Sequence, residues 1–121
     1  MTSKTQSYHC GLADSPILYQ TIGRYLDTIA KRYPDNEALV VCHQSIRWTY
    51  REFNCEVDRL AKGLLALGIR PGDRVGIWGP NSYEWTLVQF ATAKIGAILV
   101  CVNPAYGLYD LEYALNKVAC K

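Results

Sequence analysis

The sequence has no block of basic residues and no hydrophobic run long enough to span a bilayer. Its thirteen lysines and arginines stand against eleven acidic residues and are scattered along the chain. The longest apolar run, from Ile95 to Val102, includes a glycine and falls far short of the roughly 20 residues that a transmembrane helix needs. These absences argue against a nucleic-acid-binding surface and against a membrane span.

Histidine is scarce, and the cysteines do not have metal-binding spacing. The two histidines, His9 and His43, lie early in the chain, and no Cys-x-x-Cys pair occurs. A zinc site built from both histidines with Cys10 and Cys42 is disfavoured, because adjacent residues of a strand point to opposite faces. We interpret Cys42 as a buried thiol beside a turn histidine. The odd number of five cysteines favours a reducing compartment.

The glycine patterns of the common nucleotide-binding loops are also absent. Gly76 and Gly79 stand in Gly-x-x-Gly spacing, which matches neither the dinucleotide fingerprint nor the P-loop. A complete small nucleotide-binding protein is therefore disfavoured. We expect Asn81 and Ser82 to serve a tight turn in which either can cap the next helix, with an anion site there as the weaker alternative. Ser82 is not flanked as in a nucleophile elbow, which disfavours a hydrolase.

The chain does have the composition of one globular domain, with 50% hydrophobic and 20% charged residues in a length of 121. Residues 1–16 are polar, contain Lys4 as their only lysine or arginine, and lack the apolar core of a signal peptide. We expect residues 1–16 to be a flexible polar lead and residues 17–121 to form the domain. A secreted protein is not indicated, and a mitochondrial or cytoplasmic location stays open.

Hydrophobic periodicity predicts a helix and then a hairpin in the first part of the domain. Apolar residues at three- and four-residue spacing predict an amphipathic helix that Pro34 ends. The expected buried face consists of Ile22, Tyr25, Leu26, Ile29, Ala30 and Tyr33. The apolar runs at 38–42 and 46–49, separated by a polar break, predict a β-hairpin.

A capping box predicts where the next helix begins. Thr49 is followed three residues later by Glu52, just before an apolar helical face, so a long helix should begin at Tyr50. That face holds Phe53, Val57, Leu60, Ala61, Leu64 and Leu67. Gly68 should end the helix in the left-handed conformation.

The remaining sequence alternates between strand and helix patterns. Strands are expected at 74–78 and 97–102, and helices at 85–95 and 109–118. The nearly continuous apolar run 97–102 predicts a strand that is buried on both faces, as central parallel strands are. The alternation calls for another strand after Lys121, so we expect a parallel sheet that this chain begins and does not complete.

The aromatic and acidic side chains are interpreted conservatively. We expect the three tryptophans to belong to the core more often than to a ligand wall; they are Trp48, Trp78 and Trp85. We expect the helix and turn carboxylates to be solvated surface groups; they are Asp27, Glu52, Glu56, Asp58, Asp73, Glu84, Asp110 and Glu112.

Two stretches of the sequence resemble known motifs; they are residues 46–53, which read Ile-Arg-Trp-Thr-Tyr-Arg-Glu-Phe, and residues 93–104. They are similar to the first and second core motifs of the adenylate-forming enzymes, the family of acyl-CoA synthetases, luciferases and peptide-synthetase adenylation domains. Residues 70–75 and 78–85 stand between them at the spacing of that family. The segment 78–85, together with Val-Asn-Pro-Ala-Tyr at 102–106, most resembles the medium-chain acyl-CoA ligases.

The resemblance covers about residues 15–121 and implies an α/β fold, the amino-terminal portion of the family's large domain. It implies an enzyme that uses ATP and magnesium to convert a fatty acid to an acyl-adenylate and then transfers the acyl group to coenzyme A. The family's phosphate loop, its aromatic-Thr-Glu motif, its ribose-binding Asp, its hinge and its carboxy-terminal Lys have no counterpart in this sequence. We therefore assign no catalytic, cofactor-binding or metal-binding residue.

Two hypotheses follow. In the first, this is the amino-terminal fragment of a medium-chain fatty acid CoA ligase, inactive alone, whose partner is the remainder of the ligase domain. In the second, it is a stand-alone interaction module, without catalysis, that docks on a full-length ligase. In both hypotheses the fatty acid, ATP and coenzyme A are substrates of the full-length enzyme. We expect no nucleic acid to bind.

Overall fold

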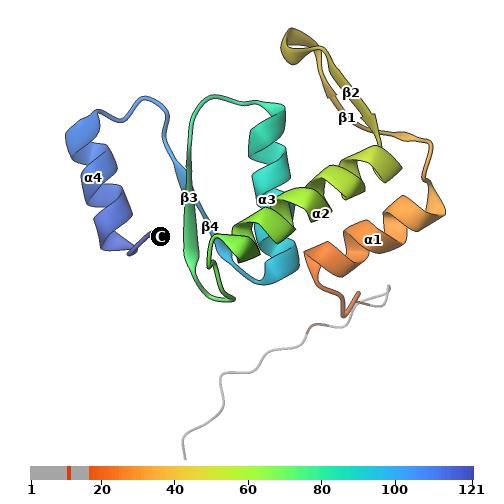
Figure 1. Cartoon of the computed structure of the whole chain (residues 1–121), viewed down its shortest axis with the longest axis horizontal. Helices are drawn as coiled ribbons and strands as arrows, with labels where there is room; N and C mark the ends of the chain where they lie inside the picture. Colours follow the sequence, from red (N-terminus) through yellow and green to blue (C-terminus); the bar gives the residue numbers. More distant parts are fainter. Residues whose placement is uncertain (1–10, 12–16) are drawn as a thin grey trace, which may run out of the picture.

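The computed structural model describes Gly11 and residues 17–121, which form a helix, a hairpin and a β-α-β-α unit (Figure 1). Helix α1 (Ile22–Arg32) begins after Thr21, whose hydroxyl accepts a hydrogen bond from the backbone N–H of Arg24 at 3.3 Å. Strands β1 (Glu37–Val41) and β2 (Ile46–Thr49) are antiparallel and are joined by the short 3-10 helix η1 (Cys42–Gln44). The predicted hairpin is confirmed.

Helix α2 (Tyr50–Ala66) begins at the predicted capping box. The backbone N–H of Glu52 donates to Thr49 Oγ1 at 3.3 Å, and the backbone N–H of Thr49 donates to the Glu52 carboxylate at 2.8 Å. These backbone and side-chain hydrogen bonds from Thr49 hold the pKa of Glu52 below its ordinary value. Gly68 follows the helix with φ of 91°, so its predicted left-handed conformation is confirmed.

The second half is built around a parallel strand pair. Strands β3 (Arg74–Trp78) and β4 (Ile98–Val102) are connected by helix α3 (Tyr83–Ile95), and helix α4 (Leu108–Lys117) follows. These elements lie within a residue or two of the predicted ranges. Ser82, and not Asn81, caps α3, because its side chain accepts from the backbone N–H of Trp85.

Strand β3 has neighbours on both of its edges. It pairs with β4 in parallel, and Arg74 also forms an isolated parallel bridge with Cys120. The backbone N–H of Lys121 donates to the Arg74 carbonyl at 2.9 Å. Gly76 allows α4 to approach β3, because a Cβ at this position would lie 3.1 Å from Leu115 Cδ2.

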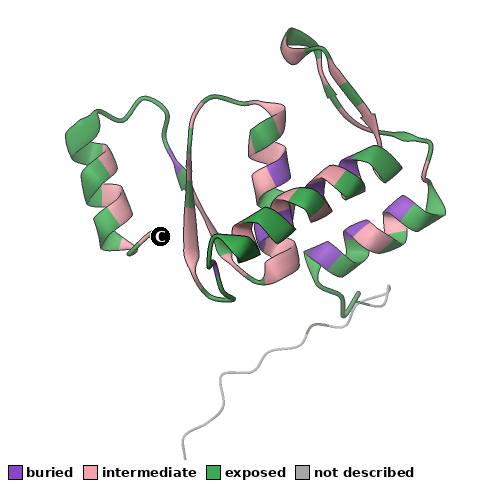
Figure 2. Ribbon diagram, in the orientation of Figure 1, coloured by how far each residue is buried: buried purple, intermediate pink, exposed green. Residues whose placement is uncertain are grey.

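The core lies where α1, α2 and α3 face one another, and the purple positions of Figure 2 gather there. Val57 and Ala91 are fully buried, and the rings of Phe53 and Phe90 meet edge to face at 5.4 Å. The buried cluster consists of Leu26, Phe53, Val57, Ala61, Leu87 and Ala91. The α2 face that the sequence predicts is therefore confirmed at its central positions.

The predicted buried face of α1 is confirmed at Leu26 and Ala30 and is wrong at Ile22 and Tyr25. The buried residues are Gly23, Leu26 and Ala30, whereas Ile22 is 63% exposed and Tyr25 is 44% exposed. The reason is a close helix crossing, because a Cβ on Gly23 would lie 2.9 Å from the Cα of Lys94. The side of α1 that carries Gly23, Leu26 and Ala30 therefore faces the core, and Ile22 and Tyr25 lie outside it.

The prediction that β4 is buried on both faces is also wrong, as Ile98 is 50% exposed and Cys101 is exposed. A continuous apolar run does not say which faces of a strand are covered. The expectation that the tryptophans belong to the core is confirmed for Trp48, which packs against the core cluster, and is wrong for Trp78. Trp78 at the end of β3 is 49% exposed, and Trp48 and Trp85 are half-buried.

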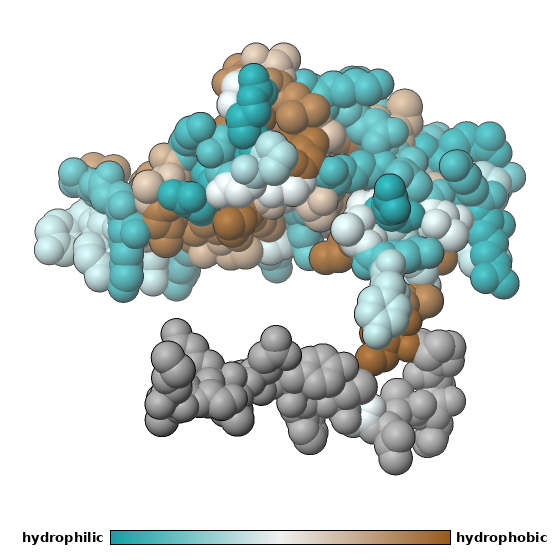
Figure 3. Space-filling view, turned by 90° about the horizontal axis from the view of Figure 1, so that it is seen from below, coloured by the Kyte–Doolittle hydropathy of each residue, from teal (hydrophilic) through white to brown (hydrophobic). Residues whose placement is uncertain are grey.

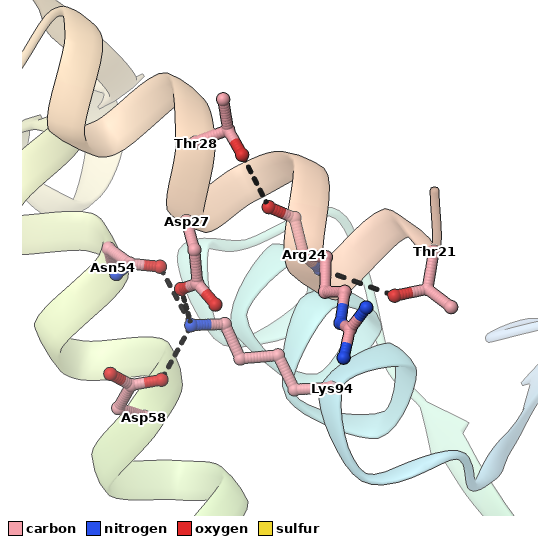
Figure 4. Close-up of polar contacts among 7 residues, drawn as sticks. All are labelled: Thr21, Arg24, Asp27, Thr28, Asn54, Asp58 and Lys94. Atoms are coloured by element: carbon pink, nitrogen blue, oxygen red, sulfur yellow. Dashed lines mark hydrogen bonds and ion pairs between the residues drawn. The ribbon is translucent and has the colours of Figure 1, made fainter. Parts of the chain in front are cut away.

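The helices α1, α2 and α3 are also joined by one lysine (Figure 4). The Nζ of Lys94 on α3 donates to Asp27 of α1 at 2.5 Å and to Asp58 of α2 at 2.6 Å. It also donates to Asn54 Oδ1 at 2.8 Å, and its side chain is only 11% exposed. Asp27 and Asp58 remain partly exposed, as the sequence predicts, but they are ion-pair partners of Lys94, which the sequence analysis did not predict.

The ionisation of this cluster follows from its contacts. Burial by itself lowers the pKa of Lys94, but the hydrogen bonds to Asp27 and Asp58 outweigh it, so the pKa is raised. The hydrogen bond from Lys94 likewise holds the pKa of Asp27 below its ordinary value. Both shifts favour the charged forms at neutral pH.

Replacing Thr49 tests the capping box. Thr49→Ala removes the acceptor for the Glu52 backbone N–H, so the free energy of unfolding should fall by about 0.5 to 2 kcal/mol. Urea unfolding followed by circular dichroism measures this loss. Thr49→Ser keeps the hydroxyl and should stay close to the wild type. Equal losses in the two variants would contradict the capping role.

Replacing Lys94 tests the ionic cluster. Lys94→Met leaves two carboxylates without their cation and should cost about 1 to 3 kcal/mol at neutral pH. The loss is smaller than for a fully buried pair because the side chains of Asp27 and Asp58 are 44% and 46% exposed. Lys62→Met, at an exposed lysine of α2, is the matched control and should have little effect.

The same variant should change the pH dependence of stability. The depressed pKa of Asp27 gives stability that is present at neutral pH and is lost as the pH falls below about 4. Urea midpoints of Lys94→Met should therefore fall less steeply in acid than those of the wild type. Parallel curves would show that Lys94 does not stabilise the Asp27 carboxylate.

Candidate functional site

The carboxyl ends of β3 and β4 meet at one edge of the sheet, which is where open α/β folds bind ligands. A groove of about 570 Å³ lies at this edge. It is lined by Gly79, Pro80, Asn81, Trp85, Cys101, Val102, Asn103 and Pro104. This carboxyl-end groove is the first candidate site.

The two loops that line the groove are held by local hydrogen bonds. After β3, the Ser82 hydroxyl accepts from the backbone N–H of Trp85 at 3.4 Å and starts α3. After β4, the Asn103 side chain accepts from the backbone N–H of Ala105 at 3.0 Å and fixes the exit turn. Residues 79–81 form bends between β3 and α3, and Ser82 caps the helix as the sequence predicts.

A residue from the hairpin also binds the beginning of α3. Gln44 Oε1 accepts from the backbone N–H of Tyr83 at 2.8 Å, and Gln44 Nε2 donates to the Glu84 carboxylate at 3.0 Å. The hydrogen bond from Gln44 lowers the pKa of Glu84, and the charge of Glu84 raises the pKa of Tyr83. Two N–H groups of the first turn of α3 thus already have acceptors, which weakens the alternative of an anion site there.

A second groove, of about 430 Å³, lies between the hairpin, α2 and α3. The rings of Trp48 and Tyr83 meet edge to face at 5.2 Å on its wall. Glu56 and Arg59, which form an ion pair, also line it, and Gly63 leaves open space at its α2 side. Its lining is mainly aromatic and aliphatic, so it offers a packing surface and not a set of reacting groups.

The chemistry available in the carboxyl-end groove is limited. Its lining consists of one glycine, two prolines, two amides, one indole, Val102 and Cys101, which is exposed. In the part of the chain that the structure describes, no cluster of three or more His, Cys, Asp and Glu side chains could hold a metal ion. The arrangement can accommodate a flat or apolar group beside Trp85, and it presents no general acid and base pair.

The remaining sequence candidates are placed as follows. Cys42 is exposed and free, so its interpretation as a buried thiol is wrong; Cys55, Cys101 and Cys120 are also free thiols. The other half of the disfavoured zinc arrangement, His9 and Cys10, lies outside the described residues. Among the described helices, none is long and apolar enough to cross a membrane.

Sequence reasoning missed the residues that connect distant elements. Gln44 lies 39 residues from Tyr83, and Lys94 lies 67 residues from Asp27. Nothing in the local pattern around Gln44 distinguishes it from an ordinary turn residue. Lys94 lies inside the second family motif, within a mostly apolar stretch. A lysine in such a stretch is a signal that could have indicated a paired, largely buried charge.

Comparisons with known proteins agree with this architecture. The rat medium-chain acyl-CoA ligase ACSF2, mitochondrial, is 54% identical over 115 residues, which are 95% of this chain and 19% of the relative. The putative acyl-CoA synthetase YngI of Bacillus subtilis is 48% identical over 84% of this chain and 18% of its own length. The chain thus spans about a fifth of the length of the curated relatives that it matches.

Solved structures give the same result. A fatty acyl CoA synthetase of Mycobacterium tuberculosis superposes with a TM-score of 0.81 and 34% identity, over 84% of this chain and 20% of that one. The family described as AMP-binding enzyme matches residues 26–121 and so includes both resembling motifs. In the structure the first motif forms β2 and the capped start of α2, and the second forms the end of α3, with Lys94, and β4. Because the family match covers residues 26–121, the chain belongs to the family of AMP-binding enzymes.

Proposed function

We propose that this chain is the amino-terminal part of a medium-chain fatty acid CoA ligase that works in mitochondria. The observation that carries the proposal is the 54% identity over 95% of the chain to a ligase whose name states both the medium chain length and the mitochondrion. The matched segment is 19% of that ligase, so the rest of the enzyme would be supplied by sequence outside these 121 residues.

The whole ligase would join a fatty acid to coenzyme A in two steps. ATP and the acid would first give an acyl-adenylate and pyrophosphate, and the coenzyme A thiol would then displace AMP. Magnesium would neutralise the phosphate charge in the first step. The described residues offer this ion no set of carboxylate ligands, so we assign it no ligand in this part of the chain.

The contribution of this segment would be structural. The helices α1, α2 and α3 form a layer held by a common core and by Lys94, and β3 and β4 begin the parallel sheet. Residues 17–121 would form this portion of the domain, with residues 1–16 as a polar lead. The carboxyl-end groove would then be completed by the remainder of the domain.

Exposed apolar side chains support a need for such a remainder. Trp78 and Ile98 are about half exposed at 49% and 50%, and Leu108 and Tyr109 are exposed by 82% and 83%. They belong to β3, β4 and α4, on the sheet side of the molecule. An exposed surface of this kind usually marks an interface. It would serve the ligase domain in the leading hypothesis, or a full-length ligase in the interaction-module alternative.

The coding sequence distinguishes these two hypotheses. Sequencing the transcript beyond the Lys121 codon should give an open frame that encodes a Ser/Thr/Gly-rich phosphate loop. An expressed transcript with a stop codon directly after Lys121 would contradict the proposal and favour the stand-alone module.

Activity gives the second test. The longer product should catalyse pyrophosphate exchange that depends on medium-chain fatty acids, and the 121-residue chain should give no exchange above buffer. The physical reason is that the short chain lacks the groups that position phosphate and acyl groups. Exchange by the short chain that persists through repurification would contradict its structural role. If the longer product preferred long-chain fatty acids, only the proposed medium-chain specificity would be contradicted, and the proposed ligase activity would stand.

The exposed sheet side should also affect the short chain in solution. We expect it to bind an apolar-surface dye and to elute as an oligomer at high concentration, because β4 and α4 expose large apolar groups. Leu108→Ser should reduce both signals, and Leu67→Ser, at an equally exposed leucine beyond α2, serves as the control. A monomer that melts cooperatively and binds no dye would contradict this expectation.

A further inference from the structure

One polar contact joins the hairpin to the beginning of α3, and both of its partners lie in described residues. The side chain of Gln44, the last residue of η1, binds Tyr83 and Glu84, the first two residues of α3. We call this the Gln44 contact. Exposed apolar side chains, some of which Figure 3 shows in brown, would instead be covered by the remainder of the ligase proposed above, so they indicate no separate partner.

Both ends of the Gln44 amide are used in this contact. Oε1 accepts from the backbone N–H of Tyr83 at 2.8 Å, and Nε2 donates to the Glu84 carboxylate at 3.0 Å. The hydrogen bonds from Gln44, from the backbone N–H of Glu84 itself and from Ser82 lower the pKa of Glu84, so this acceptor is charged at neutral pH. A hydrogen bond to a charged acceptor is stronger than one between neutral groups. The first turn of α3 is therefore held from a residue 39 positions away.

The hairpin turn that carries Gln44 has an unusual backbone conformation. Ser45, the next residue, has a φ of 53°, in the left-handed region that residues other than glycine seldom adopt. Its backbone N–H donates to the Cys42 carbonyl at 3.1 Å and closes the turn. Such a conformation persists where surrounding contacts hold it, and it is frequent at functional positions. The Gln44 contact is one of the contacts that hold this turn in place.

The loop between β3 and α3 depends on the first turn of α3. Among the described residues, none of the backbone hydrogen bonds that turns and loops form involves residues 79–81. The loop is therefore anchored by the end of β3 on one side and by the start of α3 on the other. Gly79, Pro80 and Asn81 line the carboxyl-end groove, and so does Trp85 from the first turn of α3.

We propose that Gln44 is a positioning residue for the carboxyl-end groove. By fixing Tyr83 and Glu84, it sets the position of residues 79–81 and of Trp85 on one wall of the groove. Gln44 is not among the residues that line this groove, so it acts through α3. The kinetic part of the proposal rests on the ligase function proposed above, with the groove as part of the substrate site.

Reversing the polarity of the contact tests the proposal in the longer ligase. Gln44→Glu alone places a carboxylate beside that of Glu84. It should raise KM for the fatty acid, ATP or coenzyme A about tenfold, because a small displacement of a positioning wall is costly. Gln44→Glu with Glu84→Gln again provides an acceptor for the Tyr83 N–H and a donor for the partner side chain. This double variant should return KM to about the wild-type value, and kcat should change little in either variant.

Thr49→Ala is the matched control, because it also removes a hydrogen bond from the first turn of a helix, at the start of α2. Gln44→Ala and Thr49→Ala should lower the urea midpoint by similar amounts, and only Gln44→Ala should raise KM. Circular dichroism verifies that each variant is folded. If Gln44 only stabilised the fold, the two variants would both leave KM unchanged.

Hydrogen exchange of the 121-residue chain gives a measurement that needs no activity. In Gln44→Ala the segment 79–85 should exchange about tenfold faster than in the wild type, because one hydrogen bond contributes about this factor. The segment 50–53 should be unchanged, and Gln44→Glu with Glu84→Gln should restore slow exchange at 79–85.

Several results would overturn the proposal. They are unchanged exchange at 79–85, an equal increase at 50–53, an unchanged KM in the active ligase, and a double variant that restores nothing. A longer product that is inactive as the wild type would contradict the proposed ligase function alone. The exchange measurement would then decide whether Gln44 positions this wall of the groove.

Discussion

One nearly buried ammonium group fixes how the helices α1, α2 and α3 sit against each other. Lys94 on α3 reaches a carboxylate of α1 and a carboxylate of α2, so each of its ion pairs crosses a helix interface. An unpaired charge at this position would be costly, and the pairing therefore penalises any arrangement that separates the helices. Because α3 also connects β3 to β4, its position carries over to the sheet and to the groove at the carboxyl ends of the strands.

The features that sequence reasoning predicted correctly are those with a local cause. The start of α2 follows from Thr49 and Glu52, three residues apart, and its end follows from Gly68, whose φ of 91° suits glycine. The hairpin and the bounds of β3 follow from short apolar runs between turn residues. For each of these, the interacting groups lie within one or two turns of chain, so the sequence pattern contains the whole cause.

The features that the sequence analysis did not predict depend on contacts between residues that are distant in the chain. The exposure of Ile22 and Tyr25 was not predicted, because hydrophobic spacing does not indicate the close approach of Gly23 to α3. The hydrogen bonds of Gln44 to the start of α3 and the ion pair between Lys94 and Asp27 depend on which elements are neighbours in the fold. The general rule for open α/β folds gives the location of the groove at the carboxyl ends of the strands. It does not give the residues that line the groove, because they come from two loops that the sheet brings together.

The two family motifs contribute to the packing of the helices in this chain and contain no pair of reacting groups. The first motif ends at the first turn of α2, and Asn54 and Asp58 follow on that helix; the second motif contains Lys94. Lys94 binds both Asn54 and Asp58, so hydrogen bonds of 2.8 and 2.6 Å join the second motif to the helix that the first motif begins. A well-packed apolar trio of similar volume would stabilise the interface at least as well. We interpret the charged cluster as a device for orientation, since a lysine with three fixed acceptors allows one arrangement of α1, α2 and α3 where an apolar contact allows several.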